Sequence, residues 1–385
     1  MRHRFPCLAV ASFAVVLAAC GSSSGGGGTA GTSAGGAAST GAGGSGAGAA
    51  AGNGAGAAAG GTAGPGAGGM SSAGGASSAG GASSTGGAAG DPGGTITTYP
   101  ATYAPVMVPP GQESTQCIVF KLPNNSPVLV RRFSTMLNDG THHIILYRAP
   151  GEAENLTPKP CQGFSGLLTG AHPIFIAQQK HSELKMPLAE DGRPVALDLD
   201  ANETVRMEMH FINTTQAPIS VGGTIAMDTL DATTTPADAW VKSDLAFWGT
   251  ANINIPAQGK GDTGVKFQTA LPDTHIFALT THQHHLGTSM KVWYGTGAND
   301  LSKMVANGTS WSDPPLEIFS PPLAFPAGQS LGLAYECQWQ NTTSTAVHFG
   351  ESVNDEMCFL WHYYYPAVGF QLCIPEAGGC QIKSK

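Results

Sequence analysis

The chain has 385 residues, a formal net charge of −8 and a small charged fraction of 11%. No basic cluster is larger than the pair Arg131-Arg132, which argues against nucleic acid as a partner. Arg2 and Arg4 lie in a segment that we expect to be removed, so 16 basic (18 − 2) and 26 acidic residues leave the mature chain near −10. The length suffices for two domains of typical size after a long low-complexity stretch is set aside.

Residues 1–20 are typical of a secretory signal peptide. They combine a basic start, an apolar core too short to span a membrane and small residues before Cys20. The run Leu17-Ala18-Ala19-Cys20 also resembles the lipobox of bacterial lipoproteins, in which the cysteine is acylated and becomes the new N-terminus. We therefore expect lipidation at Cys20 and a lipid-anchored protein of the bacterial cell envelope, at the outer membrane or the cell surface. The alternative is an ordinary signal peptide with a chance cysteine.

Residues 21–94 consist almost entirely of glycine, alanine, serine and threonine. No lysine, arginine, aspartate or glutamate occurs between Cys20 and Asp91. Such a segment buries too little apolar surface to offset its conformational entropy, so we predict a disordered linker between the anchor and a folded head.

From residue 95 onward the sequence predicts an all-β fold of two tandem antiparallel jelly-roll β-sandwich domains, 95–240 and 241–385. Short strand-like runs are separated by turn residues, and no long amphipathic helix is evident. The best candidate for the join is Thr229–Lys242, which is rich in threonine, proline, aspartate and alanine. The predicted strands are 106–122, 128–130, 141–147, 203–213, 218–227, 245–255, 263–269, 274–286, 289–294, 330–337 and 357–365.

The strongest candidate for a metal site is His282 with His284, at the end of the run 274–286. Residues i and i+2 of a strand share a face, so both imidazoles should point the same way and reach one ion. Imidazole suits copper, zinc, iron and nickel alike, so the pair alone names no metal. The alternative is a polar strand end with incidental histidines.

His142 and His143 follow a turn at Asn138-Asp139-Gly140. Neighbours on a regular strand point to opposite faces, so these two could hold one ion only at a strand end or a bulge, which the turn permits. Otherwise one packs inside and the other meets solvent.

His210 lies on the polar face of the run 203–213, together with Arg206 and Glu208. The opposite face of this run is apolar. His210 is therefore either available as a ligand or solvated at the surface.

Six cysteines remain when Cys7 and Cys20 are set aside, and an even number in an exported chain indicates disulfides, with fifteen possible pairings. No Cys-x-x-Cys occurs, so a zinc ribbon is not indicated. Cys337 and Cys358 would clamp the acidic turn that carries Met357 to a neighbouring strand. A methionine in this setting is more often a core residue than a ligand.

Taken together, the motifs resemble the copper type II, ascorbate-dependent monooxygenases, the family of peptidylglycine α-hydroxylating and dopamine β-monooxygenases. The resemblance extends over about residues 100–370. Any one motif is weak, whereas four in the same order are specific. They are Thr141-His142-His143-Ile144-Ile145-Leu146, Met209-His210-Phe211, His275-Ile276-Phe277-Ala278 followed by His282-Gln283-His284-His285-Leu286-Gly287, and Asp355-Glu356-Met357-Cys358.

The resemblance implies two copper ions per chain, one in each jelly roll. Ascorbate or a similar one-electron reductant would drive hydroxylation of a small organic substrate by dioxygen, in a monomer that touches the membrane only through its lipid. His285 follows the motif without being a ligand. The implied ligands are His142, His143 and His210 for the electron-transfer copper and His282, His284 and Met357 for the oxygen-binding copper.

Departures from the family concern the substrate. The peptide-hydroxylating branch carries an arginine where this chain has Thr280, and asparagine and tyrosine where it has Phe359 and Trp361. Glycine-extended peptides are therefore not expected, and Phe359 and Trp361 suggest a less charged or aromatic substrate. Glu208 replaces a glutamine of that branch.

Another departure concerns disulfides. A family cysteine expected near Phe267 is missing, which leaves Cys373 to pair with Cys380, and Cys117 with Cys161.

Two other functions fit the same sequence. One is a copper-binding redox lipoprotein of this fold without catalysis, and the other is a surface binding module, because fold does not fix function. The remaining histidines lie outside any ligand pattern: His172, His181, His275, His348 and His362.

Overall fold

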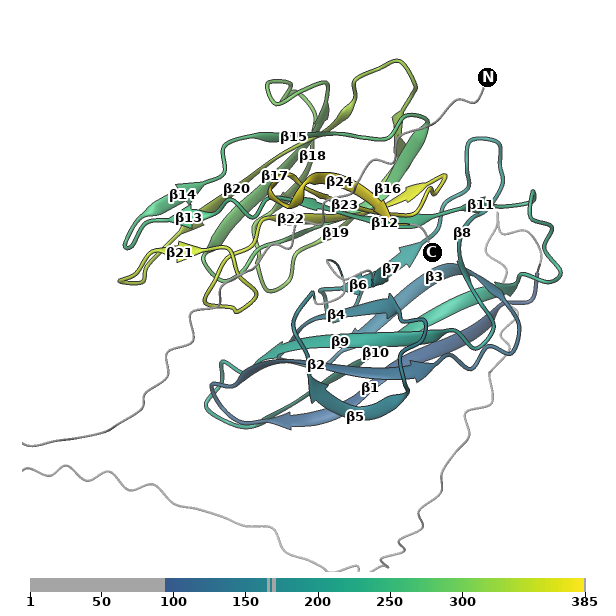
Figure 1. Cartoon of the computed structure of the whole chain (residues 1–385), viewed down its shortest axis with the longest axis horizontal. Helices are drawn as coiled ribbons and strands as arrows, with labels where there is room; N and C mark the ends of the chain where they lie inside the picture. The colour runs from purple at the N-terminus through teal and green to yellow at the C-terminus, as the bar shows by residue number, and fades with distance from the viewer. Residues whose placement is uncertain (1–93, 165–166, 168–170, 384–385) are drawn as a thin grey trace, which may run out of the picture. The chain divides into compact units, whose positions relative to one another are not determined.

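A computed structural model describes residues 94–383, apart from 165–166 and 168–170. The predicted signal peptide with Cys20 and residues 21–93 of the predicted linker lie outside the described residues. Within them the chain is all-β, as predicted, and its only helix is the short 3-10 turn η1 (Pro375–Ala377) (Figure 1). No helical segment in that part of the chain has the length and hydropathy needed to span a lipid bilayer.

Residues 97–242 form two sheets, drawn in blue to teal in Figure 1. The first has the order β1-β10-β3-β8-β11, with β7 beside β3, and the second has the order β5-β2-β9-β4-β6. All neighbours are antiparallel except β11 and β8. The bounds are β1 Thr97–Val108, β2 Glu113–Lys121, β3 Val128–Leu137, β4 Thr141–Arg148, β5 Asn155–Pro160, β6 His172–Ala177, β7 Glu183–Lys185, β8 Val195–Leu199, β9 Thr204–Ile212, β10 Ile219–Asp231 and β11 Val241–Lys242.

Residues 244–383 form a second group of sheets, drawn in green to yellow. One has the order β19-β16-β22-β12-β23-β24, another β14-β20-β17-β18 with β15 beside β20, and β13 pairs with β21. The bounds are β12 Asp244–Gly249, β13 Asn254–Ile255, β14 Lys260–Asp262, β15 Lys266–Thr269, β16 Thr274–His282, β17 Gly287–Gly295, β18 Met304–Gly308, β19 Leu316–Phe325, β20 Gly332–Gln340, β21 Val347–His348, β22 Phe359–Tyr365, β23 Phe370–Ile374 and β24 Gly379–Lys383.

One hydrophobic cluster joins the two groups of sheets. It contains residues of β4, β6 and β9 together with residues of β12, β16 and β22. The hydroxyl of Tyr363 on β22 accepts a hydrogen bond from the backbone N–H of Ile176 on β6, at 3.2 Å. Strand β22 is buried along its whole length, and β4 from its second residue onward. Strands buried on both faces lose the alternation that marks a half-exposed strand.

Several predicted boundaries differ from the structure. The run 106–122 is two strands, because Pro109-Pro110-Gly111 makes a turn between β1 and β2. The run 274–286 ends as a strand at His282, and His284 lies in the following turn. The buried strand β6 was not expected, since it is a short apolar run that contains a proline. Residues 232–240 lie between strands, and the division into domains stays a prediction.

The three disulfides are those that the sequence favoured. They join Cys117 to Cys161, Cys337 to Cys358 and Cys373 to Cys380.

Candidate metal centre

A bulge at the start of β4 brings two neighbouring histidines to one side. The pairing of β4 with β9 shifts register between Thr141 and His143, so His142 is the extra residue and His143 lies opposite His210. The ring centroids of the three histidines lie 5.1–5.3 Å apart. One donor nitrogen from each can be chosen so that all three lie within 4.8 Å of one another. Of the arrangements that the sequence left open, the structure shows the bulge, and the geometry suits a shared ion.

The imidazoles of His142 and His143 make no hydrogen bond within the described part of the chain. Both are buried, and neither ring nitrogen of either residue has a partner among the described residues. Burial lowers the pKa of both well below the ordinary value, and the neighbouring histidines lower it further. Both rings are therefore neutral at pH 7. Buried polar atoms without partners are rare in proteins, and a metal ion would satisfy them.

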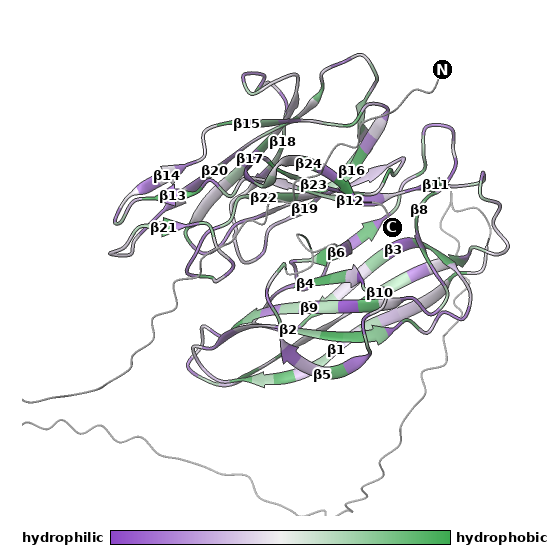
Figure 2. Ribbon diagram, in the orientation of Figure 1, coloured by the Kyte–Doolittle hydropathy of each residue, from purple (hydrophilic) through white to green (hydrophobic). Residues whose placement is uncertain are grey.

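Glu208 is buried beside this triad. Its carboxylate accepts hydrogen bonds from the hydroxyl of Tyr147 at 3.1 Å and the backbone N–H of Phe164 at 2.9 Å. Burial raises the pKa of Glu208 to about 7 against the effect of these bonds. One of its oxygens lies 3.9 Å from Nε2 of His143. The sequence left this face of β9 open as either solvated or available for a ligand, and Glu208 and His210 on it are buried. Figure 2 shows both hydrophilic and hydrophobic residues along this strand.

Glu113 on β2 connects the triad to the second group of sheets. One oxygen lies 2.9 Å from Nε2 of His210 and also accepts the backbone N–H of Val353 at 2.7 Å. Burial raises the pKa of Glu113, but the bonds from His210 and Val353 outweigh it and leave the pKa below the ordinary value. A carboxylate from one group of sheets thus contacts a histidine of that group and a turn of the other.

Hydrogen-bond acceptors beside His282 and His284 determine which ring nitrogen of each carries the hydrogen. Nδ1 of His282 lies 2.6 Å from the amide oxygen of Gln178, and Nδ1 of His284 lies 3.1 Å from the carbonyl oxygen of Asp355. Both partners can only accept, so each Nδ1 carries the hydrogen and each Nε2 keeps its lone pair. Neither Nε2 has a hydrogen-bond partner in residues 94–383 as far as the structure describes them.

Burial keeps these two rings neutral as well. It lowers the pKa of His284 to about 4 and that of His282 well below the ordinary value. Their ring centroids lie 5.4 Å apart. The pair is therefore close although His284 has left the strand, and its nitrogens suit a metal.

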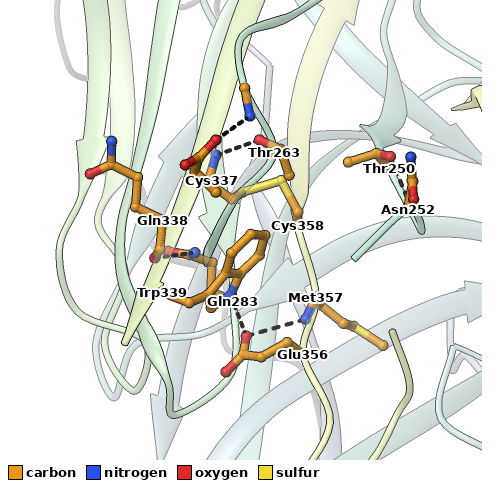
Figure 3. Close-up of a disulfide and its surroundings, with 12 residues drawn as sticks. Thr250, Asn252, Thr263, Gln283, Cys337, Gln338, Trp339, Glu356, Met357 and Cys358 are labelled. Atoms are coloured by element: carbon orange, nitrogen blue, oxygen red, sulfur yellow. Dashed lines mark hydrogen bonds between the residues drawn. A yellow bond between two sulfur atoms is a disulfide. The ribbon is translucent and has the colours of Figure 1, made fainter. Parts of the chain in front are cut away.

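The buried carboxylate of Glu356 holds the turn that follows β16. It accepts the backbone N–H groups of His284 at 3.0 Å and Leu286 at 2.7 Å. It also accepts the indole N–H of Trp339 at 2.8 Å and the backbone N–H of Met357 at 3.3 Å (Figure 3). Burial raises the pKa of Glu356 to about 7, and these bonds counteract it. One side chain therefore fixes the backbone of both His284 and Met357.

Met357 is the remaining predicted ligand. It is 2% exposed and precedes Cys358, whose disulfide to Cys337 ties the turn to β20 (Figure 3). Its side chain belongs to the hydrophobic cluster that joins the two groups of sheets. The clamp expected from the sequence is present.

The triad and the pair lie in one cluster. Ring centroids of His282 are 5.6 Å from His142 and 5.3 Å from His143, and those of His284 are 6.3 Å from His142 and 6.5 Å from His210. The structure thus brings together all five histidines that the sequence singled out as ligands.

A cavity of about 700 Å³ reaches this cluster at His142. The indole of Trp311 lies 5.4 Å from the His142 ring, between centroids. The proposed substrate determinants Phe359 and Trp361 do not line this cavity. They are fully buried in the hydrophobic cluster, so that expectation was wrong for these residues.

Gln178 is a further residue that sequence reasoning missed. It is buried just after β6, and its amide N–H group donates to the hydroxyl of Thr280 at 2.9 Å and to the carbonyl of Thr281 at 3.0 Å. The hydroxyl of Thr280 therefore accepts a hydrogen bond from the amide of Gln178. Nothing local to residue 178 signals this role, because all its partners lie more than 100 positions away.

The histidines outside the ligand pattern have other surroundings. The ring of His172 contacts Asp244 at 2.7 Å, and His275 stacks on Tyr365 and contacts Glu190 at 3.1 Å. His362 is buried against Trp248.

Comparison with known proteins provides information about the segment that contains His282 and His284. Residues 262–383 match the family model of the copper type II ascorbate-dependent monooxygenase, C-terminal domain. This segment contains His282, His284 and Met357. The copper-monooxygenase resemblance is thus shown for the C-terminal third of the chain.

Other comparisons carry less. A search of curated protein sequences found no match. The chain resembles the major capsid protein P2 from bacteriophage PM2 at 10% identity and a TM-score of 0.28, over 70% of this chain and 96% of that one. It resembles the D431N mutant VP2 protein of infectious bursal disease virus at 9% identity and a TM-score of 0.14, over 70% of this chain and 68% of that one. At such scores neither likeness says anything about function.

Proposed function

We propose that this protein is a copper-dependent, ascorbate-driven monooxygenase that hydroxylates a C–H bond of a small organic molecule with dioxygen. The observation that carries the proposal is a set of four buried, neutral imidazoles, each with a ring nitrogen that has no hydrogen-bond partner among the described residues. They belong to His142, His143, His282 and His284, and the last two lie in the matched monooxygenase segment. A cluster of this kind has no structural purpose without an ion, since each unpartnered buried nitrogen costs free energy.

Two ions per chain would be held by two donor sets. His142, His143 and His210 would hold the first, and an all-imidazole set suits an electron-transfer copper. His282, His284 and Met357 would hold the second, where the soft thioether favours Cu(I). Copper bound there would supply one-electron redox chemistry and dioxygen activation.

The protein's own groups prepare the cluster. Gln178 and the carbonyl of Asp355 keep the protons of His282 and His284 on Nδ1, so that Nε2 is free. Glu356 sets the backbone position of His284 and Met357. All five imidazoles are buried, which excludes bulk water, and burial keeps four of them unprotonated, those of His142, His143, His282 and His284.

The setting that we propose is an exported lipoprotein of the bacterial cell envelope, anchored at Cys20 and composed of two jelly-roll domains in a monomer. Three disulfides support export, because such bonds persist in oxidising compartments. The acidic net charge supports the absence of nucleic acid as a partner.

The test is ascorbate-dependent oxygen uptake by the full mature chain loaded with copper, with ¹⁸O₂ and a panel of neutral aromatic and aliphatic compounds. We expect one labelled oxygen atom per hydroxylated product and no turnover in His284→Ala. His348→Ala, an exposed histidine on β21, is the matched control and should retain turnover. Copper binding without uptake would instead support the non-catalytic redox lipoprotein.

A further inference from the structure

The cavity at the histidine cluster has walls from both groups of sheets. Gln178 and Lys180 follow β6, whereas Trp311 and Asp313 lie in the segment between β18 and β19. His142 of the histidine cluster also lines the cavity. A volume of about 700 Å³ lies within the range of small-molecule sites.

The wall nearest the cluster is rigid. Gln178 is buried and its amide makes hydrogen bonds to Thr280, Thr281 and His282, so it has no group left to rearrange for a ligand. Gln178 thus lines the cavity and also contacts His282, so a ligand in the cavity lies one side chain away from the pair His282 and His284.

The opposite wall offers an aromatic face. The indole ring of Trp311 lies beside His142, and 6.4 Å from the ring of His285. Trp311 is partly exposed, in contrast to Phe359 and Trp361, which are fully buried. A flat ring entering the cavity could therefore stack against Trp311.

The charges of the lining balance. Among the described residues that line it, Lys180 is the only lysine or arginine and Asp313 the only carboxylate, and the lining also includes the imidazoles of His142 and His181. The ammonium of Lys180 is also in contact with the carboxylate of Asp139. A ligand anion would have to compete with the carboxylate of Asp139 for one exposed lysine, in a protein with a net charge of −8. Most other lining groups are neutral donors and acceptors, among them Asn138, Gln179 and Thr214.

We infer that this cavity binds the organic substrate, and that the substrate is a neutral aromatic molecule with a hydrogen-bonding group such as an amide or hydroxyl. That the bound molecule is a substrate rests on the proposed function, whereas its binding requires no copper. Stacking on Trp311 and hydrogen bonds to the neutral side chains select such a molecule, and the balanced charges disfavour carboxylates and amines alike.

Four probes of similar size test the inference on the full mature chain without metal: benzamide, benzoate, benzylamine and cyclohexanecarboxamide. Isothermal titration calorimetry should show the tightest binding for benzamide. We expect each of the other three to bind at least about tenfold more weakly, in line with about 1.4 kcal/mol per tenfold change. Benzoate or benzylamine binding as tightly as benzamide would overturn the neutral class, and equally tight cyclohexanecarboxamide would overturn the aromatic one.

Variants of Trp311 locate the site. Trp311→Ala should weaken benzamide binding at least about tenfold, and Trp311→Phe should retain most of it, because a phenyl ring still stacks. Trp240→Ala, which alters another partly exposed tryptophan outside the cavity, should leave binding unchanged. Unaltered binding in Trp311→Ala, or no binding by any probe at millimolar concentration, would overturn the cavity as the site.

Copper loading separates this inference from the proposed function. Benzamide binding with no oxygen uptake in the copper-loaded chain would leave the cavity assignment intact and contradict the monooxygenase. Oxygen uptake with a substrate whose affinity is unchanged in Trp311→Ala would support the monooxygenase and overturn the assignment of the cavity as the substrate site.

Discussion

Single polar side chains decide how the imidazoles of the cluster are presented. Gln178, Glu113 and Glu356 each reach from one segment to a distant one, and each contacts a histidine or the backbone beside it. Such partners fix tautomer and orientation, and their loss typically weakens metal binding about 10–100-fold. Glu356 could have been suspected from the sequence, since it precedes Met357 in the matching motif. Gln178 could not, because only the fold brings it to β16.

Replacing Gln178 tests this idea. Gln178→Leu removes the acceptor of the Nδ1 hydrogen of His282, so we expect copper affinity at one of two sites to fall about 10–100-fold. Gln178→Glu retains an acceptor and should retain most of the affinity. Gln179→Leu, the next residue, serves as the control in copper titrations followed by electron paramagnetic resonance. Equal losses in both leucine variants would contradict a specific role for Gln178.

Glu356 should matter for stability without any metal. Glu356→Gln keeps the size but sets an amide N–H₂ group among four N–H donors, so we expect a loss of about 2–3 kcal/mol in the free energy of unfolding. Glu351→Gln alters a less buried carboxylate with one amide partner, Gln162, and should cost less. Urea denaturation of the metal-free chain measures both. Similar losses would show that Glu356 does not organise the turn.

Irregularities in strands β4 and β16 determine where the histidines lie. The bulge of β4 at His142 was one of the arrangements that the sequence left open, because two adjacent histidines can share one ion only at a strand end or a bulge. The end of β16 at His282 was not predictable, because it depends on Glu356, which is 72 positions away from His284 and 70 from Leu286. The burial of Glu208 also escaped prediction, since the alternation of β9 describes one sheet and not the layer that covers it.

The disulfide between Cys337 and Cys358 gives a prediction for the Met357 turn. The double variant Cys337→Ala/Cys358→Ala should lose about 3 kcal/mol in the free energy of unfolding and should weaken copper binding at one site. The control Cys373→Ala/Cys380→Ala removes a disulfide that joins β23 to β24. It should cost comparable stability and leave copper affinity unchanged. Copper affinity that falls equally in both would argue against the clamp.

At the level of the whole molecule, the two groups of sheets share one hydrophobic cluster, and the histidine cluster draws on both groups. The sequence predicted the all-β class and the five histidines, because strand patterns and motifs are local. It did not predict their close approach or the cavity, because these depend on how distant strands pack. Stability and metal binding should therefore be coupled through the whole unit.

Acid should destabilise the metal-free chain through His362. Burial lowers its pKa to about 3, against about 6.5 for an unfolded histidine. Between these values the unfolded chain binds a proton that the folded chain does not, so stability falls as pH falls, by about 1 kcal/mol per pH unit. His362→Phe should make the decline between pH 6 and pH 4 shallower by that amount, and His348→Phe should not. An unchanged slope in His362→Phe would contradict the burial of a neutral imidazole.

The central claim is that two copper ions are held by two donor sets, and copper per chain tests it most directly. Plasma emission spectrometry of the dialysed full mature chain should give two ions for the native protein and one for Met357→Leu, which keeps the volume but removes the thioether. Met290→Leu, which alters a buried methionine on β17, should still give two. One ion or none in the native chain, or two in Met357→Leu, would contradict the account.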